Sequence, residues 1–139
     1  MTLDKILAIS EKPGLYRLVS QTRTGLLTES LENGKKMAVS LRNNISVLSE
    51  IAVYTLTEDL PLKEVFKKIR IKENGGPTTI SHKSSKDQLE EYFFEVLPDY
   101  DEDRVYASDI KKVLRWYNIL QDKDLLSVLD EGDKTDEEE

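Results

Sequence analysis

Hydrophobic and polar positions follow two different patterns along the chain, and the change between them falls near residue 57. Before that point, short runs rich in leucine, β-branched and aromatic residues alternate with turn signals, which is typical of strands. After it, apolar residues recur every three or four positions, which is typical of amphipathic helices. The pattern predicts an α+β protein with a small β-barrel domain over residues 1–57 and a helical domain over residues 58–129.

Four to five short strands are predicted in the first segment, the clearest at residues 15–21, 25–31, 35–41 and 51–56. Leu3, Ile6 and Leu7 have helical spacing and predict one opening turn of helix. Pro13-Gly14 then predicts a break in the chain, and Asn33-Gly34 predicts a type I′ hairpin turn between two strands. So few short strands cannot cover both faces of an open sheet. We therefore expect a closed barrel of the SH3-like or Sm-like kind, which leaves no exposed edges.

Three amphipathic helices are predicted in the second segment. The first begins near Asp59. The second opens with a capping box between Ser85 and Gln88 and ends at Pro98, while the third begins with Ser108 as its N-cap. Each helix has a single apolar stripe, so the segment predicts a three-helix bundle.

Composition narrows the class of protein. The 139 residues include no cysteine, which excludes a disulfide framework, a thiolate metal site and a cysteine nucleophile. No apolar run approaches the roughly 18 residues that span a bilayer, and the first residues lack the pattern of a secretory signal. We therefore expect a cytoplasmic protein with no membrane partner.

Charge is distributed unevenly along the chain, whose formal net charge is −7. Residues 60–83 contain six basic and two acidic residues, whereas residues 130–139 contain one basic and seven acidic residues. The last ten residues are predicted to be a disordered acidic tail, because they contain no apolar residue to bury. The basic middle predicts a surface that binds a partner.

Catalytic and cofactor-binding motifs are not evident in the sequence. Gly75-Gly76 is followed by Pro77, which has no N–H to donate, and no Gly-Lys-Ser/Thr phosphate loop occurs. His82 is the one histidine, whereas zinc sites need several ligands, and no acid is placed by sequence to orient it. We therefore predict no enzyme activity, no catalytic residues and no cofactor.

The acidic segment between the second and third predicted helices suggests a calcium loop at first sight. Asp99, Asp101 and Asp103 stand at positions 1, 3 and 5 of an EF-hand pattern. Position 6, where glycine is needed, is Arg104, and position 12, where glutamate is needed, is Ile110. The segment is therefore predicted to be a solvated loop without a metal site.

The candidate partner-binding residues lie on the first predicted helix, away from its apolar stripe. They are Lys63, Lys67, Lys68, Arg70 and Lys72. Such a basic face, followed by a glycine- and serine-containing loop, is able to contact nucleic-acid phosphates, although every polar helix face carries some charge. The third helix offers a weaker alternative as a recognition helix with four polar residues facing outward: Lys111, Lys112, Arg115 and Asn118.

Three features of the first 57 residues carry a resemblance: the run PGLY at 13–16, the hairpin sequence TESL followed by NGK, and the run IAVYT. Together they resemble an uncharacterised, conserved family of Bacteroidetes proteins. The resemblance implies a cytoplasmic, two-part protein with an SH3-like N-terminal part and a helical C-terminal part. It implies no activity and no functional residues.

The sequence favours a non-enzymatic cytoplasmic binding or adaptor protein that contacts a macromolecular partner. We expect the partner to be a protein. The alternative is an RNA- or DNA-binding regulator that uses the basic helix at residues 62–72.

Overall fold

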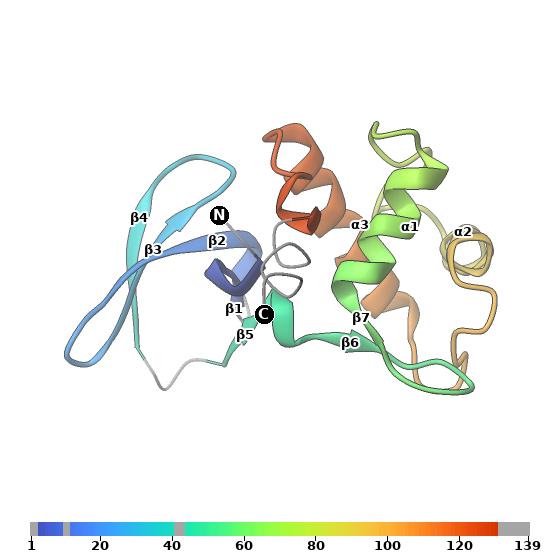
Figure 1. Cartoon of the computed structure of the whole chain (residues 1–139), viewed down its shortest axis with the longest axis horizontal. Helices are drawn as coiled ribbons and strands as arrows, with labels where there is room; N and C mark the ends of the chain where they lie inside the picture. The colour runs from blue at the N-terminus through green and yellow to red at the C-terminus, as the bar shows by residue number, and fades with distance from the viewer. Residues whose placement is uncertain (1–2, 10–11, 41–43, 131–139) are drawn as a thin grey trace. The chain divides into compact units, whose positions relative to one another are not determined.

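The computed structural model describes residues 3–9, 12–40 and 44–130, and it has the α+β composition that the sequence predicts. The chain divides into two compact units (Figure 1). Unit 1 consists of residues 1–51 and 127–139, and unit 2 consists of residues 52–126. The predicted acidic tail, apart from Asp130, lies outside the described residues.

Unit 1 contains a five-stranded antiparallel sheet in the order β4-β3-β2-β1-β5. Its strands are β1 (Ile6–Ile9), β2 (Lys12–Gln21), β3 (Gly25–Ser30), β4 (Lys36–Ser40) and β5 (Ile45–Val47), with 3₁₀ turns η1 (Leu3–Lys5) and η2 (Leu48–Glu50). Among the described residues β4 and β5 are the two edges of this sheet and do not pair with each other. The sheet they form is therefore open, and the closed barrel expected from the sequence is not found.

The beginning of unit 1 is more extended than its spacing predicts. The opening helical turn is present as η1, but Ile6 and Leu7 belong to β1, which pairs with both β2 and β5. Both side chains are buried, so pairing on two sides outweighs the helical spacing. Pro13-Gly14 does not break the chain. It lies within β2, where the pairing with β1 shifts register and Gly14 has a φ of 90°.

The hairpin between β3 and β4 is present, but its turn is longer than the predicted type I′ turn. The Ser30 N–H donates to the Lys35 carbonyl at 2.9 Å, and the Gly34 N–H donates to the Ser30 carbonyl at 2.9 Å. Gly34 has a φ of 75°, whereas Asn33 is not among the residues with positive φ. The Asn33 side chain instead accepts a hydrogen bond from the Lys35 N–H at 2.9 Å, which stabilises the longer loop.

Unit 2 is mainly helical, with α1 (Leu62–Lys72), α2 (Lys86–Val96) and α3 (Ala107–Asp122). Each helix contacts the other two, and each contributes a large, fully buried ring to their shared core: Phe66, Phe93 and Tyr117, respectively. The predicted strand at 51–56 is only two residues long. It is β6 (Ala52–Val53), which pairs with β7 (Leu60–Pro61) just before α1 instead of joining the main sheet.

The starts of α2 and α3 test the two helix caps that were predicted from local sequence patterns. The predicted capping box of α2 is confirmed, because the Gln88 N–H donates to Ser85 Oγ and the Ser85 N–H donates to Gln88 Oε1. The N-cap of α3 is Tyr106, so the prediction for Ser108 is wrong. The Tyr106 N–H donates to the Asp109 carboxylate at 3.0 Å, which stabilises an earlier start of the helix.

Among the described residues no helix combines the length and the apolarity that crossing a membrane would require.

Candidate functional site

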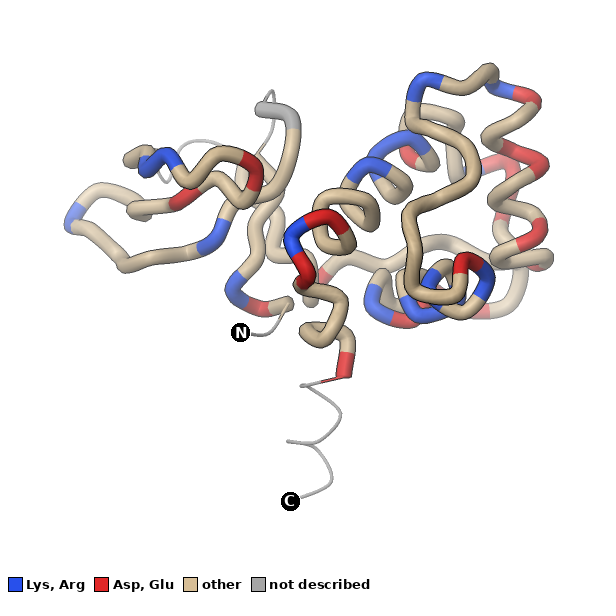
Figure 2. The backbone as a smooth tube through the Cα atoms, turned by 90° about the horizontal axis from the view of Figure 1, so that it is seen from above, with Lys and Arg blue, Asp and Glu red and all other residues tan. Residues whose placement is uncertain are grey.

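The five predicted partner-binding residues all lie on α1, whose backbone carries both basic and acidic positions (Figure 2). Several of the five interact with other residues of the chain. Lys67 Nζ lies 3.6 Å from Glu64 Oε2, Lys72 Nζ lies 2.6 Å from Glu95 Oε1, and Arg70 donates to the Leu126 carbonyl at 3.4 Å. Lys63 is half-buried and Lys68 is exposed. The positive charge of α1 is thus partly neutralised by acids of unit 2.

The loop between α1 and α2 is anchored along α3. The Tyr117 hydroxyl donates to the Gly76 carbonyl at 2.8 Å. The Thr78 N–H donates to Asn118 Oδ1 at 2.9 Å, and Asn118 Nδ2 donates to Thr78 Oγ1 at 2.8 Å. These three bonds make the loop part of the packed structure of unit 2. They also occupy Asn118, which the sequence had suggested as an outward-facing recognition residue.

Glu73, at the end of α1, forms a second anchor for this loop. Its Oε2 atom accepts hydrogen bonds from the Thr79 N–H at 2.9 Å and from the buried Tyr92 hydroxyl at 2.5 Å. Burial raises the pKa of Tyr92, and the hydrogen bond to Glu73 raises the pKa further. One carboxylate therefore links the end of α1, the loop and α2.

Replacing Glu73 by alanine should lower the free energy of unfolding by about 1–3 kcal/mol, because it leaves the buried Tyr92 hydroxyl without its acceptor. The Thr79 amide should also exchange its hydrogen with solvent faster. Urea unfolding followed by the fluorescence of Trp116, together with hydrogen exchange, measures both effects. Glu73→Gln is the control, because its amide oxygen still accepts a hydrogen bond. Equal stability of the two variants would contradict the role of this bond.

A group of cationic side chains lies where the anchored loop follows α3. Lys111, Arg115 and Asn118 are spaced i, i+4 and i+7 and share one helix face. Asn118 holds Thr78 on that face, and the loop continues to His82 and Lys83. The pKa of His82 is lowered by partial burial, and then by the positive charges of Arg115, Lys83 and Lys111. We call these four residues the cationic cluster: His82, Lys83, Lys111 and Arg115.

The acidic loop before α3 is held by its own hydrogen bonds. Asp101 accepts from Arg104 Nε at 2.8 Å and from the Asp103 N–H at 3.0 Å, and the bond to Arg104 lowers the pKa of Asp101. Arg104 also stacks over the ring of Tyr54, with its Cζ atom 4.4 Å from the ring centroid. Within the described ranges, no three His, Cys, Asp or Glu residues are placed to hold a metal ion.

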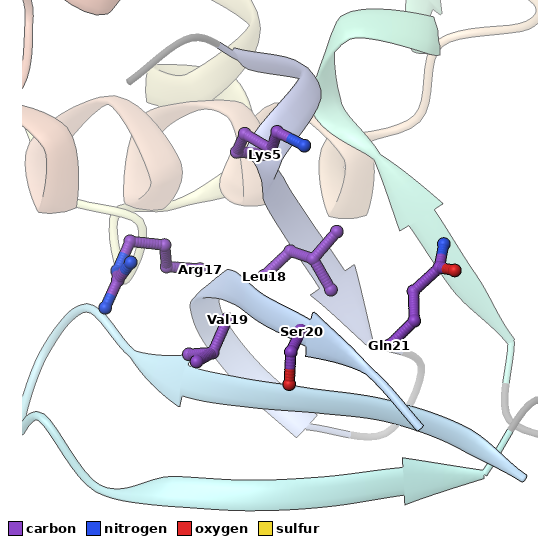
Figure 3. Close-up of a pocket in the computed structure, with 6 residues that line it drawn as sticks. All are labelled: Lys5, Arg17, Leu18, Val19, Ser20 and Gln21. Atoms are coloured by element: carbon purple, nitrogen blue, oxygen red, sulfur yellow. The ribbon is translucent and has the colours of Figure 1, made fainter. Parts of the chain in front are cut away.

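An open hollow of about 630 Å³ lies beside β2 in unit 1, lined by Lys5 and by the consecutive residues Arg17, Leu18, Val19, Ser20 and Gln21 (Figure 3). Successive side chains of a strand point to opposite faces of the sheet. A hollow that touches five consecutive residues therefore lies against the edge of the strand rather than on one face.

The pairing of β2 explains why this edge is open. Among the described residues, the pairing of β1 with β2 reaches no farther along β2 than Arg17, which lies opposite Ile6, the first residue of β1. Lys5, the residue before Ile6, belongs to η1. Residues 18–21 of β2 continue to pair with β3 on the other side, through a register shift between Leu18 and Ser20. The end of β2 thus has a neighbouring strand on one side and the hollow on the other.

The charges around the hollow are of two kinds. Arg17 forms a cross-strand salt bridge, with its Nη2 atom 2.6 Å from Glu29 Oε1, and this bond lowers the pKa of Glu29. Lys5 is exposed and forms no salt bridge with any described residue. The hollow therefore offers one uncompensated positive charge beside a strand edge.

Neither the hollow nor the cationic cluster was predicted as a site from the sequence. The hollow results from a difference in length between β1 and β2, and the strand at 15–21 was the only part of it that the sequence indicated. The cluster joins residues about thirty positions apart, and His82 seemed to have no chemical neighbours. The single signal available was the i, i+4 spacing of Lys111 and Arg115.

Two family models match the chain, each described as a domain of unknown function. The DUF5606 model matches residues 3–48, and the DUF6852 model matches residues 51–120. A solution NMR structure from Bacteroides vulgatus, determined as a structural genomics target, is 43% identical and covers 89% of each chain with a TM-score of 0.76. No curated protein matches the chain. These matches confirm the predicted resemblance to an uncharacterised family.

Proposed function

Since the chain belongs to the family of the DUF6852 domain and carries a DUF5606 match ahead of it, we propose that it is a non-enzymatic binding protein whose partner is another protein. The observation that carries the proposal is the open edge of β2 beside the hollow. We also propose a cytoplasmic location, which the cysteine-free sequence favours.

An open strand edge binds proteins by adding a strand. Residues 18–21 have backbone N–H and C=O groups on the side that β1 does not reach, and such groups pair readily with an extended peptide. Leu18 and Val19 are half-buried and Ser20 and Gln21 are exposed, so a docked segment would meet both apolar and polar side chains. Main-chain hydrogen bonds would supply affinity, and the hollow would supply selectivity.

The charge at the hollow selects the kind of segment. Lys5 immediately precedes β1 and has no acidic partner among the described residues, whereas Arg17 is already paired with Glu29. A peptide that continues the sheet would place a side chain near Lys5, and an acidic side chain there would complement its charge. The partner that fits this edge is an extended protein segment with an acidic residue.

The test uses two β-prone pentapeptides that differ only in one central residue, glutamate or lysine. Amide NMR spectra of the full chain should show larger shifts at residues 18–21 with the glutamate peptide. Lys5→Glu, an exposed change, should reverse the preference between the two peptides. Equal or absent shifts with both peptides would contradict the proposal.

Nucleic acid bound through α1 is the alternative function, and it is favoured by the exposed Lys68 and by the excess of positive charge in residues 60–83. The same NMR experiment with a single-stranded RNA tests it. Salt-sensitive shifts at Lys63, Lys67, Lys68, Arg70 and Lys72, with none at the edge of β2, would replace the protein partner by a nucleic acid.

A further inference from the structure

Residues 54–56 and 99–101 run antiparallel to each other and form a short two-stranded segment, all of it in unit 2. Thr55 bridges to Tyr100, and a backbone hydrogen bond on each side of this bridge, of 2.8 and 3.0 Å, holds the two stretches together. The side chains of Thr55 and Tyr100 are both buried. Because side chains alternate along a strand, the residues before and after each of them point to the opposite, outward face.

This outward face consists of two apolar and two acidic side chains: Tyr54, Leu56, Asp99 and Asp101. Leu56 is 72% exposed and Tyr54 is 43% exposed. The two hydrogen bonds set the register, which places Leu56 opposite Asp99 and Tyr54 opposite Asp101. The water-facing side of an antiparallel pair is usually polar, so two large apolar side chains displayed there indicate a surface that another molecule covers.

The backbone around Leu56 is fixed, so its side chain is held in the exposed position. The Leu56 N–H donates to the Asp99 carbonyl at 2.8 Å. The Thr55 hydroxyl oxygen accepts from the Thr57 N–H at 3.2 Å and from the Glu58 N–H at 3.0 Å. A surface that is already ordered loses little conformational entropy when a partner binds to it.

The charges around the face are mainly negative. Residues 54–59 and 99–104 together contain six acidic residues and one basic residue, Arg104. Arg104 is paired with Asp101 at 2.8 Å, and its guanidinium group lies over the ring of Tyr54. Asp99 is exposed and forms no salt bridge with any described residue. An uncompensated carboxylate therefore stands directly opposite the exposed leucine.

We propose that this outward face binds a protein segment in which a large apolar residue adjoins a lysine or arginine. The apolar side chain would cover Leu56 and Tyr54, and the cation would pair with Asp99. A second copy of the chain, docked through the same face, would bring like charges together, and a nucleic acid would be repelled. The inference goes beyond the proposed function, because it concerns the other unit and selects the opposite charge.

The test follows the amide NMR spectrum of the full chain during titration with a blocked pentapeptide, alanine-lysine-leucine-lysine-alanine. One control peptide has glutamate in place of both lysines, and the other has serine in place of leucine. We expect saturable shifts at residues 54–56 and 99–101, with a Kd of about 0.1–5 mM for the first peptide and at least about tenfold weaker binding of both controls. Equal binding of the three peptides, or no shifts at these residues, would overturn the proposal. Shifts at the same residues on simple dilution of the chain would assign the face to a second copy and overturn it as well.

Two exposed apolar residues provide a matched pair of variants. Leu56→Ala should weaken binding of the lysine peptide by about fivefold or more, because it removes the apolar contact. Ile71→Ala should change it by less than about twofold. Ile71 is 79% exposed but lies on α1, roughly 15 Å along the helix from β7. Both side chains are mostly in water, so neither variant should unfold. Equal weakening by the two variants would refute the assignment to this face.

Asp99→Lys tests the charge separately. It should abolish the preference for the lysine peptide over the glutamate peptide, because it reverses the carboxylate that the partner's cation would meet. An unchanged preference would exclude Asp99 from the surface and overturn the proposed pairing. These results are distinguishable from failure of the proposed function, which is measured at residues 18–21 of unit 1.

Discussion

Replacing Phe93 by alanine is expected to lower the free energy of unfolding by about 3–5 kcal/mol. Phe93 lies on α2, is fully buried, and packs edge-on against Tyr100 with the ring centroids 5.0 Å apart. Its removal deletes a large apolar surface and leaves a cavity among three helices that cannot all close around it. Since a domain of this size is stable by only about 5–15 kcal/mol, much of unit 2 should be unfolded at modest urea concentrations.

The control for this prediction is the next residue in the chain. Phe94 is 52% exposed, so Phe94→Ala should change stability by only about 0.5 kcal/mol. Trp116 is the one tryptophan and belongs to α3, so its fluorescence reports the unfolding of unit 2 for both variants. A similar loss of stability for Phe93→Ala and Phe94→Ala would mean that α2 does not bury the face that contains Phe93.

Gly25→Ala is expected to lower the stability of unit 1 by about 3 kcal/mol. A Cβ atom at Gly25 would lie 1.9 Å from the Val39 carbonyl oxygen and 2.9 Å from its carbon. Both are backbone atoms of β4, which pairs with β3 through Gly25 opposite Ser40, so a rotamer change cannot remove the clash. The two strands must separate locally, and the amide hydrogens of β3 and β4 should exchange faster with solvent.

Gly34→Ala separates this clash from the general cost of replacing a glycine. Gly34 has a φ of 75° but no atom within 4 Å of an added Cβ, so only the left-handed backbone is penalised, by about 1 kcal/mol. Hydrogen exchange and urea unfolding of the two variants should differ accordingly. If Gly34→Ala proved the more damaging change, close packing of β3 on β4 at Gly25 would be refuted.

The parts of the fold that the sequence predicted correctly depend on neighbouring residues. The capping box of α2 needs only Ser85 and Gln88, and the apolar stripe of α1 needs only its own spacing. The failures involve distant partners. Ile6 and Leu7 have helical spacing, yet they form a strand because β2 pairs with both of them and β5 pairs with Leu7 from the other side.

The same distinction between neighbouring and distant residues applies to the candidate sites. The basic residues of α1 are visible as a count of lysines, but the pairing of Lys72 with Glu95 on another helix is not. The loop that contains His82 is held on α3 by hydrogen bonds from Tyr117 to Gly76 and between Thr78 and Asn118, and none of these pairs is evident in the sequence. The hollow depends on where β1 stops relative to β2, which is a property of pairing and not of either segment.

The division of the chain has a mechanical consequence. The chain leaves unit 1 after Ile51 and returns to it at Ser127, so unit 2 is inserted into unit 1. A stretching force applied at both chain ends enters and leaves through unit 1, and the inserted unit carries no load until unit 1 has opened. Two successive rupture events are therefore expected in a single-molecule pulling trace, the first from unit 1 and the second from unit 2.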